Sequence, residues 1–316
     1  EDAHVGRRAH GQRRQVELDH LHHALGQSKA GHSKVVAVVG EAGVGKSRLF
    51  HEFKERSRQG CLVLETFSVS HGKAFAYFPL IELLNNYFQI TAQDDERRCR
   101  EKVMGKTLTL ERSFEDLVPY LLYLLGVGER SSVLAEMDPQ IRRDRTFDAI
   151  TQVLACESRN QPIELLFEDL QWLDCETEAF LAYLIDHLAS PILLLVNYRP
   201  EYQPVWTRAG HCSQLRLEPL GPADAQVLLA SLLGDDPTLA PLKLLILDKT
   251  EGNPFFMEEV VQTLLEEKLL LGEPGQYRIE QTPAVLHIPT TVQGVLAARI
   301  DRLPFAEKEL LQTLAV

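Results

Sequence analysis

Eight consecutive residues carry the groups needed to hold a polyphosphate. Residues 40–47 read Gly-Glu-Ala-Gly-Val-Gly-Lys-Ser and match the phosphate-binding pattern G-x-x-x-x-G-K-[ST] at every fixed position. A glycine loop of this kind turns several backbone N–H groups toward one phosphate group. Together with the next residue, the motif predicts these phosphate-binding residues: Gly40, Glu41, Ala42, Gly43, Val44, Gly45, Lys46, Ser47 and Arg48.

The segments on either side of this loop support the interpretation. Residues 34–39 form an apolar run typical of a buried parallel strand, and residues 47–54 have the pattern of a helix. The loop amides then lie at the positive end of the helix dipole. Lys46 adds a point charge toward the β- and γ-phosphate oxygens, and the Ser47 hydroxyl can ligate Mg²⁺. The sequence therefore predicts a site for a nucleoside triphosphate and Mg²⁺.

Two carboxylates follow a second apolar run. Residues 163–167 predict a strand, and Glu168 and Asp169 come directly after it. In a nucleoside triphosphatase, one such acid holds Mg²⁺ through water and the other orients or deprotonates the attacking water. Spacing alone does not assign the two tasks, and an acidic pair can also be a solvated turn or a helix cap. With the glycine loop, we expect Ser47, Glu168 and Asp169 around Mg²⁺.

A third apolar strand, 192–197, ends about thirty residues after the acids, a gap that fits one strand–helix–strand crossover. The two strand ends should therefore lie side by side. Arg199 follows this strand and could contact the γ-phosphate through a two-pronged guanidinium contact, although a surface arginine fits the same position. The residues expected to take part in catalysis are Glu168, Asp169 and Arg199.

The order of the elements predicts an α/β fold with a parallel sheet and helices on both faces. Strands are also expected at 61–67 and 214–217, and the stretch 77–157 is predicted to be mostly helical. Beyond residue 218 we expect helices at 222–233, 239–250, 254–268, 289–303 and 304–316, with a β-hairpin at 269–279. The predicted divisions are an N-terminal segment (1–33), a P-loop nucleotide-binding domain (34–217), a helical lid (218–270), and a hairpin with the start of a winged-helix domain (271–316).

Composition limits the function classes. The chain has 316 residues, of which 45% are hydrophobic, so it can bury a core of more than one domain. Its net charge of −12 disfavours general nucleic-acid binding, which requires basic surfaces. No apolar run is long enough to span a bilayer. The five cysteines include no C-x-x-C pair and favour reduced thiols in the cytoplasm. The lack of an initiator methionine suggests a piece of a longer protein.

Several separated motifs resemble those of one family. These are the loop at 40–47, Leu-Phe-Glu-Asp-Leu-Gln-Trp-Leu-Asp at 166–174, Val-Asn-Tyr-Arg-Pro-Glu-Tyr at 196–202, Glu-Gly-Asn-Pro-Phe-Phe-Met-Glu-Glu at 251–259, and the segment 288–304. Together they resemble the signal-transduction (STAND) ATPases, relatives of the AAA+ proteins. The likeness is greatest to the ATPase module of class III adenylate/guanylate cyclase–tetratricopeptide-repeat proteins.

The resemblance implies further site residues. Val5-Gly6-Arg7 matches a family element near the adenine, and Gly252-Asn253-Pro254 matches a lid element whose proline, Pro254, lies against the base. The same tripeptide also fits an ordinary helix start, with the asparagine as N-cap and the proline at the first helical position. The resemblance also makes Arg199 the sensor arginine and residues 288–316 the start of a winged-helix domain.

The function expected from this combination is an ATP/ADP-dependent switch with slow turnover or none, inside a multidomain cytoplasmic signalling protein. Its expected partners are neighbouring domains of the same polypeptide, such as a cyclase, a transcription regulator or tetratricopeptide repeats, with self-association left open. Two alternatives are a DNA-handling AAA+ motor, which needs a basic DNA-binding face, and a small-molecule phosphotransferase, which needs an acceptor pocket.

Overall fold

The structure is a computed structural model that describes residues 14–69, 73, 75–127, 133–188, 190–206 and 212–279. The chain divides into two compact units, which are described separately. The sheet unit comprises Val16–Gly40 and Ser47–Arg216. The lid unit comprises, among the described residues, 14–15, 41–46 and 217–279. Most of the phosphate-loop motif is therefore grouped with the C-terminal helices rather than with the sheet.

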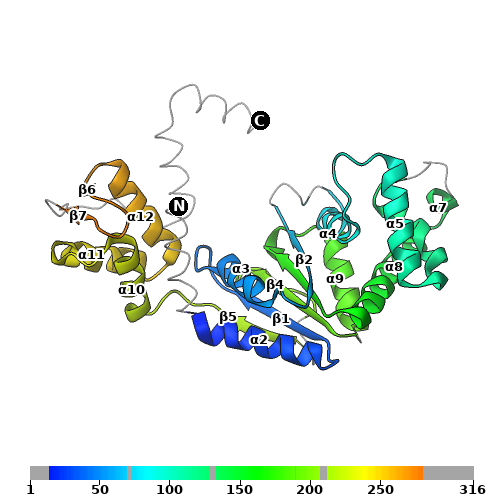
Figure 1. The fold of residues 1–316 in the computed structure, drawn as a ribbon, viewed down its shortest axis with the longest axis horizontal. Helices are drawn as coiled ribbons and strands as arrows, with labels where there is room; N and C mark the ends of the chain where they lie inside the picture. The colour runs from blue at the N-terminus through cyan, green and yellow to red at the C-terminus, as the bar shows by residue number, and fades with distance from the viewer. Residues whose placement is uncertain are drawn as a thin grey trace, which may run out of the picture. The chain divides into compact units, whose positions relative to one another are not determined.

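A five-stranded parallel sheet is the centre of the sheet unit (Figure 1), with the strand order β2-β3-β4-β1-β5. Helices lie between β1 and β2, between β2 and β3, and between β3 and β4, and supply the crossover connections that parallel strands require. The predicted α/β class with a parallel sheet is confirmed, and so is the pairing of the two strands that precede the acids and Arg199. The strands are β1 (Lys34–Val39), β2 (Leu62–Phe67), β3 (Ile163–Glu168), β4 (Ile192–Tyr198) and β5 (Cys212–Arg216).

Helices surround this sheet and account for most of residues 77–157, as predicted. The ring of His22 lies 5.0 Å from that of Phe53 between their centroids, so α2 packs against α3. The helices associated with the sheet are α2 (Gln15–Lys29), α3 (Lys46–Ser57), α4 (Phe78–Phe88), α5 (Glu96–Leu110), α6 (Val118–Leu124), α7 (Val133–Glu136), α8 (Pro139–Asn160) and α9 (Cys175–His187).

The two faces of the sheet have different neighbours. Alternate residues of β3, beginning with Ile163, join a large hydrophobic cluster with α4, α5, α6, α8 and α9. The residues between them point to the opposite face, because side chains alternate along a strand. On that face Ser57 of α3 donates a hydrogen bond to Glu164, and Ser47 of α3 contacts Glu168. All residues of β3 and β4 are buried, since both faces of these strands are covered.

Among its described residues, the lid unit contains three α-helices and a short hairpin: α10 (Pro222–Leu233), α11 (Ala240–Thr250), α12 (Pro254–Glu266), β6 (Leu270–Leu271) and β7 (Arg278–Ile279) (Figure 1). Leu270, Tyr277 and Ile279 of the hairpin share one buried cluster with residues of all three helices. The hairpin thus packs against the helices α10, α11 and α12.

The bounds agree closely with those predicted, to within three residues at any end. The predicted helices beyond residue 288 and the Val5–Arg7 element lie outside the described residues.

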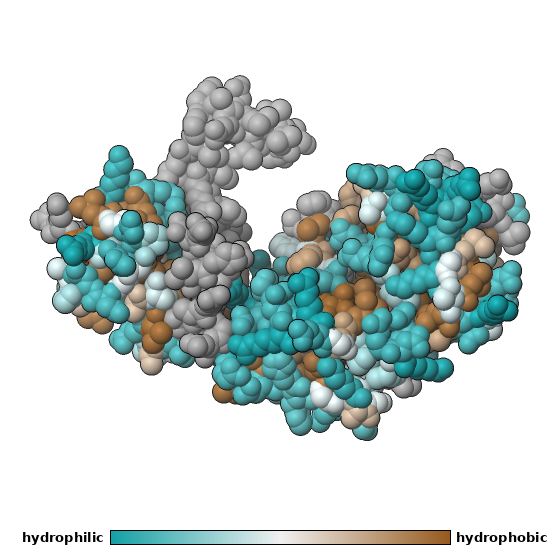
Figure 2. Space-filling view, viewed as in Figure 1, coloured by the Kyte–Doolittle hydropathy of each residue, from teal (hydrophilic) through white to brown (hydrophobic). Residues whose placement is uncertain are grey.

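In the part of the chain that the structure describes, no helix is long and apolar enough to cross a membrane. The face drawn in Figure 2 is largely hydrophilic, with hydrophobic residues in separate areas. The domain divisions themselves stay a prediction.

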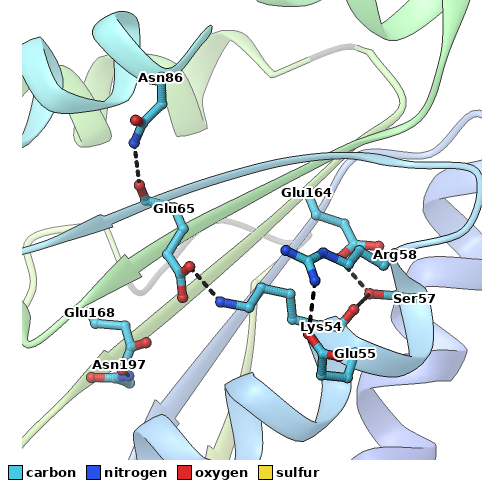
Figure 3. Close-up of polar contacts among 9 residues, drawn as sticks. All are labelled: Lys54, Glu55, Ser57, Arg58, Glu65, Asn86, Glu164, Glu168 and Asn197. Atoms are coloured by element: carbon cyan, nitrogen blue, oxygen red, sulfur yellow. Dashed lines mark hydrogen bonds and ion pairs between the residues drawn. The ribbon is translucent and has the colours of Figure 1, made fainter. Parts of the chain in front are cut away.

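One carboxyl group lies inside the sheet unit, away from the strand ends that carry the acids. Glu164, near the start of β3, is fully buried, and its Oε2 accepts a hydrogen bond of 2.8 Å from the Ser57 hydroxyl (Figure 3). Burial raises the pKa of this carboxyl, while hydrogen bonds from Ser57 and Cys61 and the charge of Lys29 act in the opposite direction. Folding therefore favours proton binding at Glu164 relative to the unfolded chain.

This burial predicts a pH dependence of stability. The native state holds the Glu164 proton above the ordinary pKa of 4.5, so the free energy of unfolding should fall as pH rises from there, by at most about 1.4 kcal/mol per pH unit. Glu164→Gln, which mimics the protonated acid, should lose this part of the slope. Urea unfolding over a pH series measures it. The exposed Glu55→Gln on α3 serves as control, and identical slopes for parent and Glu164→Gln would contradict the assignment.

Candidate nucleotide site

The glycine loop between β1 and α3 has the backbone form of an anion-binding turn. Gly43 and Gly45 have φ angles of 82° and 98°, in the left-handed region that glycine adopts without strain. The residues that precede them, Ala42 and Val44, do not have positive φ. Positive φ at alternate residues is a feature of the nests in which successive N–H groups converge on an anion.

The donors of this loop fit a polyphosphate. Within the described residues, no acceptor receives a hydrogen bond from the backbone N–H groups of Ala42, Gly43, Val44 or Gly45. Lys46 is only 7% exposed, and its Nζ donates to the backbone oxygen of Glu41 at 2.9 Å. Four amides and one ammonium group on a single short turn form a donor set suited to phosphate oxygens.

In the sheet unit, Glu168 ends β3 with its side chain on the α3 face. It is 2% exposed, and its Oε2 accepts a 2.8 Å hydrogen bond from the Asn197 amide at the end of β4 (Figure 3). Burial raises the pKa of the Glu168 carboxyl, and hydrogen bonds from Ser47 and Asn197 oppose the shift. The structure thus brings the last residue of the loop motif together with the first acid.

Asp169 has an unusual backbone that its neighbours hold in place. Its φ and ψ are 59° and 48°, a left-handed conformation that aspartate tolerates better than most residues. Its N–H donates to Asn197 Oδ1 at 2.8 Å, and its Oδ1 accepts from Gln171 Nε2 at 2.8 Å. Asn197 therefore links both acids, one through its donor group and the other through its acceptor group.

Arg199 directly follows β4, where we expected the sensor. Its backbone N–H donates to Gln171 Oε1 at 3.2 Å, and its guanidinium carbon lies 5.8 Å from the centroid of the Trp172 ring. This distance is typical of a cation–π contact. Trp172, which follows the acids in sequence, therefore supports the arginine side chain.

The ligands available for Mg²⁺ are oxygens. The Ser47 hydroxyl and the Glu168 carboxylate contact one another, and Mg²⁺ usually takes one or two protein oxygens together with phosphate oxygens and water. Among the described residues, no group of three or more histidine, cysteine, aspartate or glutamate side chains could hold a metal by itself. The residues present thus fit a metal that arrives with a polyphosphate.

The other predicted site residues are distributed as follows. Arg48 lies in the first turn of α3, and Pro254 is buried at the first position of α12, with Asn253 as the N-cap. The sequence assigned Asn253 no role of its own beyond a helix start, and it assigned Gln171 no role beyond its place in the motif at 166–174. An asparagine before a proline and a glutamine two residues after an acid are common patterns, so only a structure reveals their contacts.

With this geometry described, comparisons with known proteins identify the family. Residues 12–196, more than half of the chain, match the family described as the AAA ATPase domain. The chain belongs to this family.

The individual relatives have low sequence identity to this chain. An uncharacterized protein of Rhizobium meliloti (strain 1021) is 28% identical over 294 residues, which cover 91% of this chain. The chain spans only 28% of the length of that protein and 11% of the next curated relative. Most of the sequence of these relatives therefore lies outside the region compared.

Solved structures resemble the chain mainly in fold. The STAND protein with a tetratricopeptide repeat sensor from Pyrococcus horikoshii matches with 14% identity and a TM-score of 0.44, over 89% of this chain and 32% of that one. Cdc6p from Pyrobaculum aerophilum matches with 12% identity and a TM-score of 0.50, over 81% of this chain and 62% of that one. The structural neighbours thus include STAND and Cdc6 ATPases.

The double role of Asn197 predicts a large stability effect at the strand ends. Asn197→Ala should lower the free energy of unfolding by about 1–3 kcal/mol, because it leaves the buried Glu168 carboxyl and the Asp169 N–H without this partner. Urea unfolding without nucleotide measures the change. The control Asn86→Ala removes an exposed amide that donates to Glu65 O, and it should cost under about 0.5 kcal/mol. Equal effects of the two variants would contradict the prediction.

Proposed function

We propose that this chain is an ATP-binding regulatory switch module of a multidomain protein. The observation that carries the proposal is the turn with positive φ at Gly43 and Gly45 and its amide donors, followed in sequence by Lys46 and by a serine that contacts the buried Glu168. These are the groups that a Mg²⁺–triphosphate requires, and the chain belongs to an ATPase family.

Each residue has a proposed task. The loop amides and Lys46 bind phosphate oxygens, and Ser47 and Glu168 hold Mg²⁺, partly through water. Asp169 or Glu168 orients the attacking water, and Arg199 contacts the γ-phosphate. Bound Mg²⁺–ATP would supply the phosphoanhydride that is cleaved. We also propose that Pro254 lies against the base, and that Val5, Gly6 and Arg7 lie near the adenine.

A regulatory role fits the chain better than metabolic catalysis. The residues matched to the curated relatives form a minor part of those proteins, so the module is expected to act on domains elsewhere in the polypeptide. Exchange of ATP for ADP can shift the equilibrium between two arrangements of a lid, and this conformational change can be transmitted to neighbouring domains. The partner domain, which could be a cyclase or a transcription regulator, and a cytoplasmic location belong to this proposal.

A DNA-handling ATPase is the main competing function. The fold is shared with Cdc6p, but the net charge of −12 gives no general attraction for phosphate backbones. Titration with duplex DNA at several salt concentrations separates the two. Submicromolar affinity with a steep salt dependence would favour the DNA-handling function over the regulatory switch.

The phosphate-binding role predicts the effect of removing the loop ammonium. Lys46→Ala should weaken binding of Mg²⁺–ATP roughly 10- to 100-fold, because a charge-assisted hydrogen bond contributes about 1.5–3 kcal/mol. Isothermal titration calorimetry measures the dissociation constant. Lys54→Ala is the matched control, since this lysine lies on the same helix but pairs with Glu65. Unchanged affinity in Lys46→Ala would remove the basis of the proposal.

The two acids can be separated by turnover measurements. Glu168→Gln and Asp169→Asn keep the side-chain shapes, and asparagine tolerates the left-handed backbone of position 169. The variant that removes the water-orienting acid should lose a factor of about 10²–10⁴ in hydrolysis rate while it still binds ATP. Phosphate release under single-turnover conditions measures this rate. If both variants matched the parent rate, neither acid would take part in the chemistry.

A further inference from the structure

Three successive carbonyl groups of the glycine loop accept hydrogen bonds from outside the loop. The Asn253 side-chain Nδ2 donates to Ala42 O at 3.0 Å, and the Phe255 backbone N–H donates to Gly43 O at 3.3 Å. Arg14 Nη2 lies 3.4 Å from Val44 O and also donates to Glu218 O at 2.6 Å. All of these residues belong to the lid unit.

These contacts decide which way the loop amides point. In a planar trans peptide, the C=O and the N–H of one peptide unit point in opposite directions. Holding the oxygens of Ala42, Gly43 and Val44 on one side therefore directs the N–H groups of Gly43, Val44 and Gly45 to the other side. Those are the amides that the described residues leave for a phosphate.

The backbone before α12 fixes the position of Asn253. Glu251 and Gly252 have φ angles of 49° and 77°, which reverse the chain between α11 and α12. A Cβ on Gly252 would lie 2.2 Å from Leu220 O, and Leu220 N–H donates to Gly252 O at 2.9 Å. Asn253 N–H donates to Thr250 O at 2.9 Å. Asn253 thus directly follows a tight turn in which position 252 requires glycine.

The asparagine uses both ends of its amide. Its Oδ1 accepts the Phe255 N–H at 3.1 Å as the N-cap of α12, while its Nδ2 binds the loop, and the side chain is 8% exposed. The approach to the loop is close, because a Cβ on Gly43 would lie 2.7 Å from both Asn253 Oδ1 and Phe255 Cβ. Asn253 therefore connects the start of a lid helix to the shape of the phosphate loop.

We propose that Asn253 is a positioning residue for phosphate binding, which acts by orienting the loop amides and so links α12 to the nucleotide site. The proposal rests on the proposed function, because it assumes that the loop binds a polyphosphate. Its contribution is separable from the helix cap, since serine can accept the Phe255 N–H as an N-cap but cannot donate to Ala42 O at the same reach.

The test compares inorganic tripolyphosphate with adenosine as ligands of the full chain, by calorimetry. Asn253→Ser should weaken tripolyphosphate binding about three- to tenfold, the value of one hydrogen bond, and leave adenosine binding unchanged. Asn253→Asp keeps the shape and the cap but places a carboxylate against Ala42 O, so it should weaken tripolyphosphate binding further. Gln262→Ser, an exposed change on the same helix, should have no effect.

The outcomes separate this proposal from the nucleotide site itself. If Lys46→Ala weakens tripolyphosphate binding and Asn253→Ser does not alter it, the positioning role is wrong and the phosphate site remains. An equal loss of adenosine and tripolyphosphate binding in Asn253→Ser would indicate a displaced lid and would also overturn the role. If Lys46→Ala binds tripolyphosphate with unchanged affinity, the proposed function itself is wrong.

Discussion

The planarity of the peptide bond is the constraint on which the candidate site depends. A loop that presents several N–H groups to one anion directs the same number of carbonyl groups to its other side, and those carbonyls need hydrogen-bond donors. In this chain Gly43 and Gly45 have positive φ, and the carbonyls of Ala42, Gly43 and Val44 find donors in the lid unit. The orientation of the loop peptides therefore depends on donors outside the motif as well as on the motif's own residues.

The acids depend on a second simple rule, the alternation of side chains along a strand. Counting from Ile163, the even-numbered residues of β3 face α3, so Glu164 and Glu168 lie on one face at opposite ends. Only the carboxyl end of a parallel strand meets the start of a helix such as α3. Glu168 accordingly contacts Ser47, whereas Glu164 accepts a hydrogen bond from Ser57, and burial raises the pKa of both carboxyls.

These local rules explain which features the sequence could predict. The strand at Lys34–Val39 and the helix at Pro222–Leu233 have the bounds expected from their apolar patterns, because burial on fixed faces is a local property. The motif positions and the neighbouring ends of β3 and β4 follow from the same reasoning. The contact of Asn253 with Ala42 joins residues 211 positions apart, and no local pattern distinguishes it from an ordinary helix cap.

If Asn253 has the proposed role, the few hydrogen bonds that one side-chain amide can make limit the free energy that couples α12 to the phosphate loop. The coupling is reciprocal: phosphate binding stabilises the start of α12 by the same free energy by which the ordered start of α12 strengthens phosphate binding. One hydrogen bond contributes about 1 kcal/mol, whereas reversing a two-state population from 1:99 to 99:1 requires about 5.5 kcal/mol. The asparagine alone would therefore bias a switch without driving it. Most of the difference between two nucleotide states would have to come from contacts that the phosphates and the base make themselves.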